Sequence, residues 1–182
     1  MPLTVPTVPG KGYGVAIVLA SPQSRGRITL RSPDPTMHPA IFANYLANQE
    51  DIQKLVRGIT LVRRLNQTKA FAPFYEGDTH PDPHIRSESE MVELISGNLQ
   101  TMYHPVGTCK MGHDDLAVVD EQLRVYGVQG LRVVDASIMP KIVNGNTNAP
   151  TIMIAEKVAD LLRGVHVFIN TSSPPLLKRS SR

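Results

Sequence analysis

The sequence contains two polar clusters, YHPVGTC at Tyr103–Cys109 and NGNTNAP at Asn144–Pro150, and these decide the fold prediction. Between them lies GLRVVDAS at Gly130–Ser137, an apolar, β-branched run that ends in an acidic residue and small residues. Such a run predicts a buried strand that stops at a site. The second cluster leads into Ile152–Leu162, whose apolar spacing predicts a helix. A strand end, a polar loop and a helix N-terminus together suggest a cofactor site.

The composition is that of a chain able to bury a hydrophobic core. Of its 182 residues 41% are hydrophobic, enough for one ordinary domain or for part of a larger one. The net charge of +3 owes much to scattered arginines and to the basic end Lys178–Arg182. Because no basic face is interleaved with aromatic residues, we expect no nucleic-acid partner. No apolar run approaches the roughly 20 residues of a membrane span.

The single cysteine, Cys109, excludes an internal disulfide. The opening residues Met1–Pro6 lack the charged and apolar regions of a secretory signal. A reducing, cytoplasmic location is therefore the expectation.

Before the first cluster, the pattern predicts strands and then helices. Tyr13–Ala20 is apolar with little polar alternation and predicts a strand buried on both faces. In Arg27–Arg31 apolar and polar residues alternate, which predicts an antiparallel strand with one solvent-exposed face. A helix is expected from Asn48, with Ile52–Leu65 at helical spacing, and a second from the capping box Ser87–Glu90. The basic residues of the first helix are expected on a solvated face: Lys54, Arg57, Arg63 and Arg64.

His104 is the histidine with the most constrained backbone. Pro105 follows it and forces an extended conformation, and Gly107 comes shortly after. An imidazole can accept a proton near neutral pH, so His104 is a candidate base, with a structural role as the alternative. The remaining histidines lie in loops or near the C-terminus and are expected at the surface: His38, His80, His84, His113 and His166.

The Asn-rich cluster holds more hydrogen-bonding side chains than a plain turn needs. A helix that begins here points its free N–H groups and partial positive charge at whatever lies beyond its N-terminus. An N-cap at Asn148, with Pro150 in the first turn, explains Asn148 without a ligand. That interpretation leaves Asn146 unexplained, so Asn146 is a second candidate site residue.

The residues around Cys109 suggest two other chemistries. A metal site of His104, Cys109 and His113 would lack a fourth ligand, so no metal site is predicted. A nucleophilic pair of Cys109 and His104 would need a neighbour that lowers the thiol pKa, and the sequence offers none. A small buried cysteine is the simpler interpretation.

Several motifs in a fixed order resemble the C-terminal part of the glucose–methanol–choline (GMC) oxidoreductases, and most of all the choline dehydrogenase-like alcohol dehydrogenases. They are YHPVGTCKMG at Tyr103–Gly112, VVD at Val118–Asp120, LRVYGV at Leu123–Val128, GLRVVDASIMP at Gly130–Pro140 and GNTNAPT at Gly145–Thr151. Ser24–Leu30 and Asp51–Arg64 also resemble the substrate-domain strand and helix of that family. The resemblance covers residues 12 to 164.

The resemblance implies a mixed α+β fold. It would comprise an antiparallel substrate-domain sheet with helices, plus the last strand and helix of a Rossmann-like FAD domain. The implied parts are an extended N-terminal segment (1–12), a substrate-domain portion (13–103), an active-site and FAD-domain closing portion (104–164) and a disordered basic tail (165–182).

The resemblance also implies site residues and a cofactor, FAD. His104 matches the catalytic histidine, which takes the hydroxyl proton of an alcohol as the hydride passes to flavin N5. Asn146 matches the second member of the catalytic pair, which hydrogen-bonds the substrate oxygen. The implied FAD contacts are Asp135 and Ala136 at the strand end and Thr147 and Asn148 in the loop beside the isoalloxazine.

The sequence departs from the family in one large respect. Chains of the family begin with a G-x-G-x-x-G strand, turn and helix that hold the ADP part of FAD, and this sequence has none. We therefore expect a C-terminal segment that does not turn over by itself, with a small-molecule alcohol as substrate and the missing N-terminal FAD-binding portion as partner. The alternative is a non-catalytic remnant or a split-subunit interaction module.

Overall fold

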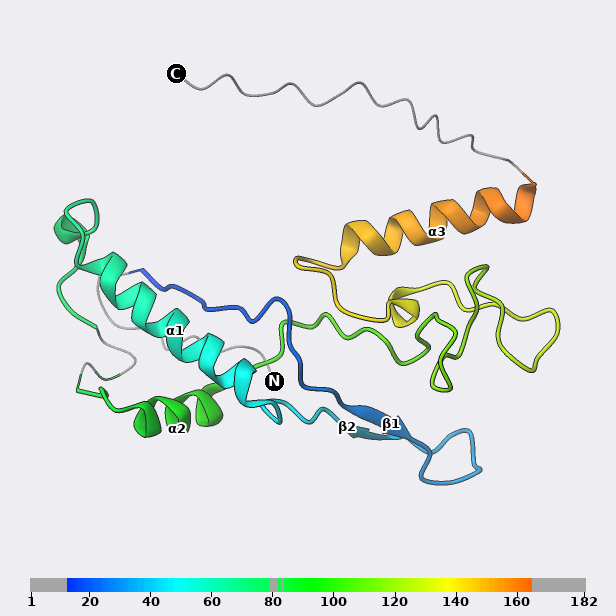
Figure 1. Cartoon of the computed structure of the whole chain (residues 1–182), viewed down its shortest axis with the longest axis horizontal. Coiled ribbons are helices and arrows are strands. Elements are labelled where there is room, and N and C mark those ends of the chain that lie inside the picture. The colour runs from blue at the N-terminus through cyan, green and yellow to red at the C-terminus, as the bar shows by residue number, and fades with distance from the viewer. Residues whose placement is uncertain (1–12, 79–81, 83, 165–182) are drawn as a thin grey trace, which may run out of the picture.

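The computed structural model describes residues 13–78, 82 and 84–164. The described residues up to 102 form an N-terminal lobe, and residues 103–164 form a C-terminal lobe. Figure 1 shows α1 and α2 together in the N-terminal lobe and α3 above the folded loops of the C-terminal lobe. In chain order the elements are β1 (Arg27–Thr29), β2 (Ala40–Phe42), α1 (Gln49–Asn66), the 3-10 turn η1 (Ala72–Phe74), α2 (Glu88–Asn98), the 3-10 turn η2 (Ala136–Ile138) and α3 (Asn148–Arg163).

Helix α1 begins where its cap predicts. Asn48 has an extended backbone, and its side-chain oxygen accepts a 2.8 Å hydrogen bond from the N–H of Glu50. This bond satisfies one of the free N–H groups of the first turn. Leu55 is buried on the inner face, as its helical spacing predicts.

Helix α2 begins at the predicted capping box. The hydroxyl of Ser87 accepts from the N–H of Glu90, and the Glu90 carboxylate accepts from the N–H of Ser87 at 3.0 Å. Met91 and Ile95 are buried, and the helix packs against α1. The helix ends at Asn98, and an irregular segment leads from it to the first polar cluster.

Strands β1 and β2 form a two-stranded antiparallel sheet in which Ile28 pairs with Ile41. The predicted antiparallel strand at Arg27–Arg31 is therefore confirmed, over Arg27–Thr29, but all three residues are exposed, so the expectation of a single solvent-exposed face is wrong. A Cβ atom at Gly26 would overlap the carbonyl oxygens of Phe42 and Ala43, so the close approach of the strands requires glycine there. The sequence did not predict β2, because its three residues follow Pro39 and are too few to show a period.

The prediction that all basic residues of α1 lie on a solvated face is wrong for Arg63. Its guanidinium donates hydrogen bonds to the carbonyl oxygens of Ile85 at 2.6 Å and Asp82 at 3.1 Å. The Asp78 carboxylate lies 3.4 Å from its Nε, and both side chains are largely buried. Arg63 therefore ties α1 to the segment that precedes α2.

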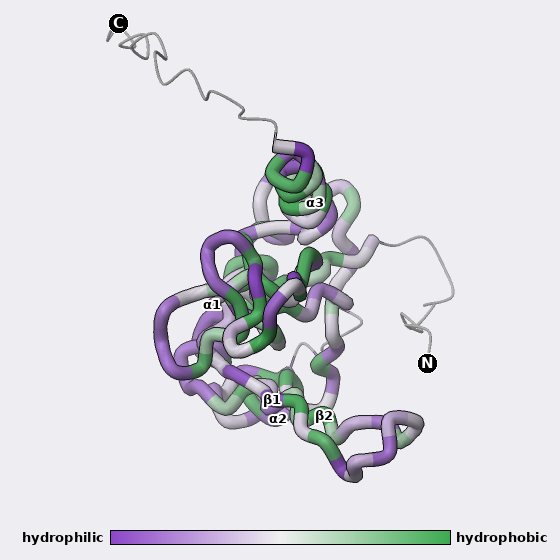
Figure 2. The backbone as a smooth tube through the Cα atoms, turned by 90° about the vertical axis from the view of Figure 1, so that its right-hand side faces the viewer, coloured by the Kyte–Doolittle hydropathy of each residue, from purple (hydrophilic) through white to green (hydrophobic). Residues whose placement is uncertain are grey.

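The core of the C-terminal lobe lies beneath α3. Ile154 and Val158 of α3 pack against four buried residues of the loops, Val119, Leu123, Ile138 and Met139. The loops contain no named strand among the described residues and are joined by isolated bridges such as Met111 with Val119. Figure 2 shows hydrophobic and hydrophilic residues alternating around the turns of α3, as expected for a helix with one buried side.

Two predicted buried strands are wrong. Tyr13–Ala20 is irregular, and Val15 and Val18 are about half exposed, at 47% and 50%. In Gly130–Ser137 the only pairing is an isolated bridge from Arg132 to Arg124, and Leu131 is 50% exposed. A strand needs a continuous neighbour for its N–H and C=O groups. Among the described residues Tyr13–Ala20 has no ladder partner, and Gly130–Ser137 meets Leu123–Val125 only through that bridge and two backbone hydrogen bonds, Val125 N–H to Leu131 O at 3.0 Å and Val133 N–H to Leu123 O at 3.2 Å. The expected last strand of a Rossmann-like domain is therefore absent from the part of the chain that the structure describes.

The predicted N-terminal segment 1–12 and the predicted tail 165–182 lie outside the described residues. Within the described residues no helix is long and apolar enough to cross a bilayer.

Candidate functional site

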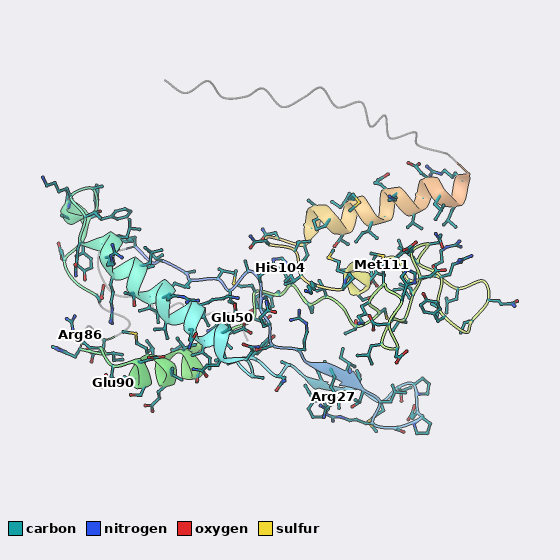
Figure 3. All side chains as sticks on the ribbon, in the orientation of Figure 1. Arg27, Glu50, Arg86, Glu90, His104 and Met111 are labelled. Carbon is teal, nitrogen blue, oxygen red and sulfur yellow. The ribbon has the colours of Figure 1, made fainter. Side chains whose placement is uncertain are left out.

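His104 lies near the N-terminal end of α3, where the chain enters the C-terminal lobe (Figure 3). It is half-buried and belongs to an irregular segment, as the sequence predicts. Before it, Tyr103 has a φ of 61°, a left-handed conformation that costs a bulky residue about 1–2 kcal/mol. Such strain is typical of segments that hold a functional side chain in place.

Gly107 fixes the other side of this segment. Its φ is 89°, and a Cβ atom there would lie 3.3 Å from the carbonyl oxygen of Met139. The N–H groups of Cys109 and Met111 then donate to the carbonyl oxygens of Ser137 and Ile138, at 3.1 and 2.8 Å. The first polar cluster is thus anchored to η2.

The contact that joins the two polar clusters is between His104 and Thr147. The imidazole Nδ1 lies 2.9 Å from the Thr147 hydroxyl oxygen, across 43 positions of sequence. Thr147 is 8% exposed and His104 is half-buried, so this bond is partly sheltered from solvent. The sequence predicted convergence of the clusters but did not single out Thr147 as the histidine's partner.

The predicted N-cap of α3 at Asn148 is wrong by one residue. Thr147 occupies the N-cap position of α3, and Asn148 is the first helical residue. Its side chain makes no capping hydrogen bond, since its hydroxyl faces His104. Its carbonyl oxygen instead accepts from the N–H and the hydroxyl of Thr151, at 3.0 and 2.6 Å.

The first N–H groups of α3 are not hydrogen-bonded within the described part of the chain. Among the described residues, no acceptor bonds the N–H groups of Asn148 and Ala149, and Pro150 has no N–H. These free groups carry the partial positive charge of the helix and suit an electron-rich group of a ligand. Asn146 is exposed in the loop that leads into this end, two residues before the helix begins.

Asp135 and Ala136 lie at η2 and not at a strand end. The Asp135 carboxylate accepts a 2.7 Å hydrogen bond from the N–H of Ser137 and caps this turn. The Ser137 hydroxyl is buried without a hydrogen-bond partner among the described residues. Since η2 bonds to the first polar cluster, all six predicted site residues belong to η2, to the first cluster, or to the loop and first turn of α3.

The remaining histidines and the cysteine are placed as follows. His38, His84 and His113 are exposed as predicted, and His80 and His166 lie outside the described residues. The Nε2 of His113 lies 2.9 Å from the Glu121 carboxylate, on the surface. Cys109 is a half-buried free thiol. No three His, Cys, Asp or Glu side chains converge within the described residues.

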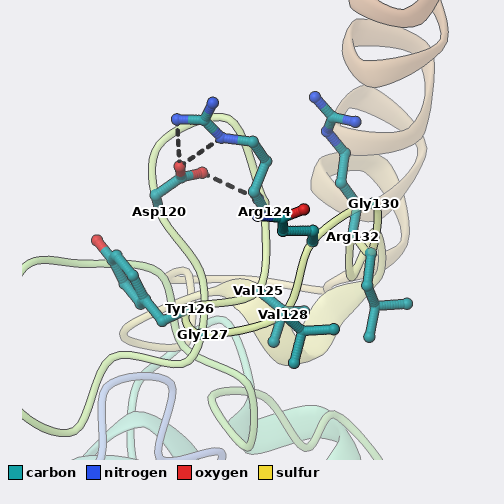
Figure 4. A pocket seen from close by; sticks show the side chains of 10 residues that line it. Asp120, Arg124, Val125, Tyr126, Gly127, Val128, Gly130 and Arg132 are labelled. Carbon is teal, nitrogen blue, oxygen red and sulfur yellow. Dashed lines mark hydrogen bonds and ion pairs between the residues drawn. The ribbon is translucent and has the colours of Figure 1, made fainter.

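A separate hollow of about 330 Å³ lies in the loop from Asp120 to Arg132 (Figure 4). Its Arg124 is held by the Asp120 carboxylate at 2.7 Å, and the Nε of Arg132 donates to the carbonyl oxygen of Gln122 at 3.0 Å. Burial alone would raise the pKa of Asp120, but hydrogen bonds from Arg124 and Gln122 lower it below its ordinary value. No residue of either polar cluster lines this hollow.

The sequence model of the GMC oxidoreductase family matches residues 22–155. The chain belongs to this family. The predicted resemblance to GMC oxidoreductases is confirmed.

Curated relatives place the chain near choline dehydrogenases. It is 50% identical over 141 residues to an oxygen-dependent choline dehydrogenase of Pseudomonas fluorescens, an alignment that covers 78% of this chain and 25% of that protein. It is 44% identical over 151 residues to one of Acinetobacter baumannii, with coverages of 83% and 27%. The chain thus spans about a quarter of the length of these relatives.

Solved structures of oxidoreductases also match this chain over only part of their own length. Pyridoxine 4-oxidase from Mesorbium loti superposes with a TM-score of 0.74 at 34% identity, over 81% of this chain and 29% of that one. An FAD-dependent oxidoreductase from Chaetomium thermophilum superposes with a TM-score of 0.75 at 26% sequence identity. The match covers 80% of this chain and 26% of that one. The GMC family is FAD-dependent, as the sequence resemblance implied.

Proposed function

We propose that this chain is the C-terminal segment of an FAD-dependent oxidoreductase that acts on the CH–OH group of a small alcohol, with His104 as general base. The observation that carries the proposal is the 2.9 Å contact between the Nδ1 of His104 and Thr147, which joins the two polar clusters at the open end of α3. Membership of the GMC family and the likeness to choline dehydrogenases support the reaction class.

His104 has the properties that a base requires. Its Nδ1 is engaged by Thr147, so Nε2 is the nitrogen left to meet a substrate. The backbone on each side is fixed by Tyr103 and Gly107, which limits how far the ring can move. A general base must come within hydrogen-bond reach of the proton it removes, and a held ring meets this condition without further ordering.

The residues at the end of α3 fit a flavin. The open N–H groups of Asn148 and Ala149 would face an electron-rich edge of the isoalloxazine, and the helix end would favour negative charge there. Asp135, Ala136, Thr147 and Asn148 are the residues of this chain proposed to hold FAD. When bound, FAD supplies the acceptor for the hydride that leaves the alcohol carbon.

Asn146 is proposed to orient the substrate oxygen. Its exposed amide can donate to an oxygen and accept from a hydroxyl, and it lies one residue before Thr147 in the same loop. His104 would then remove the hydroxyl proton while Asn146 holds the oxygen in place.

A chimera tests the proposal. Residues 22–155 would replace the matching segment of the Pseudomonas fluorescens relative, and flavin reduction by choline and other small alcohols would be followed without oxygen. His104→Ala should slow flavin reduction by about 10²–10⁴-fold, the usual contribution of a general base, while FAD stays bound. His113→Ala, which removes an exposed histidine of the same lobe, is the matched control and should change little. An unimpaired His104→Ala chimera would overturn the proposed base.

The exposed apolar side chains of α3 favour a second candidate function, an interaction module for a separately encoded FAD-binding portion. Ile152, Met153 and Leu162 are 54%, 55% and 64% exposed. Co-expression of the chain with the N-terminal three quarters of the relative separates the candidates. A complex that forms but is inactive, whether or not His104 is present, would support the interaction module over the enzyme segment.

A further inference from the structure

We propose that Thr147 is a positioning residue whose hydroxyl oxygen accepts the Nδ1–H of His104 and so selects the imidazole tautomer with an unprotonated Nε2. The choice of this tautomer rests on the proposed function, in which Nε2 is the base, but the tautomer can be measured on the chain alone without an activity assay.

The hydroxyl of Thr147 is free for this contact because of the residues that follow it. The side chain of an N-cap threonine normally accepts from the N–H of the second or third helical residue. In α3 the third helical residue is Pro150, which has no N–H, and the Thr147 side chain makes no capping bond. Pro150 thus removes one of the two usual donors, and the hydroxyl does not bond the other, the N–H of Ala149, so it is available to a residue outside the helix.

The position of the hydroxyl is also fixed. Thr147 is β-branched and buried, so few rotamers are open to it. Its carbonyl oxygen accepts two hydrogen bonds from Thr151, which hold its backbone to the first turn of α3. A held oxygen 2.9 Å from Nδ1 can orient the ring of His104.

The direction of the hydrogen bond follows from what each nitrogen must do. With Nδ1 facing Thr147, only Nε2 can receive a proton from an alcohol. A neutral imidazole carries one proton, so a basic Nε2 requires that the proton be on Nδ1, where it is donated to the Thr147 oxygen. When the alcohol proton moves to Nε2 the ring becomes a cation, and Nδ1–H still donates to the same oxygen. The contact is therefore kept through the proton transfer.

Nitrogen NMR of the 182-residue chain labelled with ¹⁵N-histidine tests the tautomer directly. Solid-state spectra would be used if the chain assembles, and His104→Gln identifies the signals. At a pH where the ring is neutral, we expect a protonated-type shift at Nδ1 and an unprotonated-type shift at Nε2. Thr147→Val, which keeps the shape of the side chain, should shift His104 toward the Nε2–H form, and Thr147→Ser should keep the Nδ1–H form.

Other results would overturn the proposal. A wild-type His104 with its proton on Nε2 would show that Thr147 donates instead of accepting. A Thr147→Val spectrum that matches the wild type, with α3 helicity retained by circular dichroism, would show that Thr147 does not select the tautomer. If Thr147→Val loses the helicity of α3, its spectrum cannot be interpreted, and the Thr147→Ser variant provides the test instead. Loss of the Nδ1–H form of His104 in Thr147→Ser would contradict the assignment.

The chimera gives an independent readout. Thr147→Val should lower kcat per bound flavin by about 10–100-fold, the range known for loss of a partner that orients a metal-ligating histidine, with KM nearly unchanged. Thr147→Ser should restore most of kcat. A fall in FAD content with an unchanged kcat per flavin would mean that Thr147 only holds the cofactor. If His104→Ala proves fully active, the proposed function fails, while the NMR result still decides the tautomer.

Discussion

The Oδ2 atom of Asp51 accepts hydrogen bonds from both the N–H and the hydroxyl of Ser24, at 2.8 and 2.7 Å, across 27 positions of sequence. Both carboxylate oxygens also accept from the N–H of Gln23, at 2.8 and 3.0 Å. Asp51 is fully buried at the start of α1, so it joins the segment before β1 to that helix. The sequence predicts a helix here, but its local spacing does not reveal the partners of Asp51.

Asp51→Asn should therefore destabilise the N-terminal lobe. The substitution removes the charge from a buried acceptor of four hydrogen bonds and places an NH₂ group among donors, so we expect a loss of about 2–4 kcal/mol. Urea unfolding followed by circular dichroism measures it. Glu50→Gln is the control, because Glu50 is exposed and pairs only with Lys54 on the surface. Its effect should stay below about 0.5 kcal/mol, and equal losses would contradict the role given to Asp51.

The same carboxylate should make stability depend on pH. Burial alone would raise the pKa of Asp51, but hydrogen bonds from Ser24 and Gln23 and the charge of Lys54 bring it below the ordinary value of 3.8. A lowered pKa in the folded state gives stability that is complete above the unfolded pKa and is lost as pH falls through the folded pKa. The urea midpoint should thus fall on acidification below about pH 4, and less so in Asp51→Asn. An identical acid dependence in both proteins would exclude this carboxylate as the source.

Gly107→Ala should disturb the segment that carries His104. At a φ of 89°, with the Met139 carbonyl oxygen 3.3 Å from the new Cβ, alanine is strained by about 1–2 kcal/mol. Gly145→Ala is the matched control in the other polar cluster, since no heavy atom lies within 4 Å of its Cβ position and its φ is not positive. Urea unfolding and the ¹⁵N signals of His104 should change in the first variant only. Equal changes in both would show that the glycine conformation is not what matters.

We expect the chain alone to self-associate through the apolar side chains near the start of α3, because they are exposed. Ile152→Glu with Met153→Glu removes two half-exposed apolar groups and adds acidic residues near a helix N-terminus, where they are favourable. We expect the chain to shift toward the monomer in sedimentation velocity. Ala149→Glu with Ala155→Glu adds the same charge at exposed alanines and is the control. If the control dissociates the chain equally, charge repulsion and not loss of apolar contact is the cause.

The sequence determined the features that depend on neighbours along the chain. Asn48 and the box from Ser87 to Glu90 cap their helices by hydrogen bonds that span three residues or fewer, so their positions could be predicted. The ordered motifs around His104 and Asn146 were likewise sufficient to predict the family, which the comparison confirms. The roles of these two residues stay predictions.

Tertiary structure alone decided the features that depend on residues far apart. Tyr13–Ala20 and Gly130–Ser137 have the composition of strands, yet a strand forms only along a continuous partner. Among the described residues the first run has no such partner and the second has only an isolated bridge. Asp51 belongs to the first turn of a predicted helix and Thr147 to a predicted polar loop, and their partners, Ser24 and His104, lie 27 and 43 positions away. A local pattern carries no information about such contacts, because the folding of the intervening chain brings the two groups together.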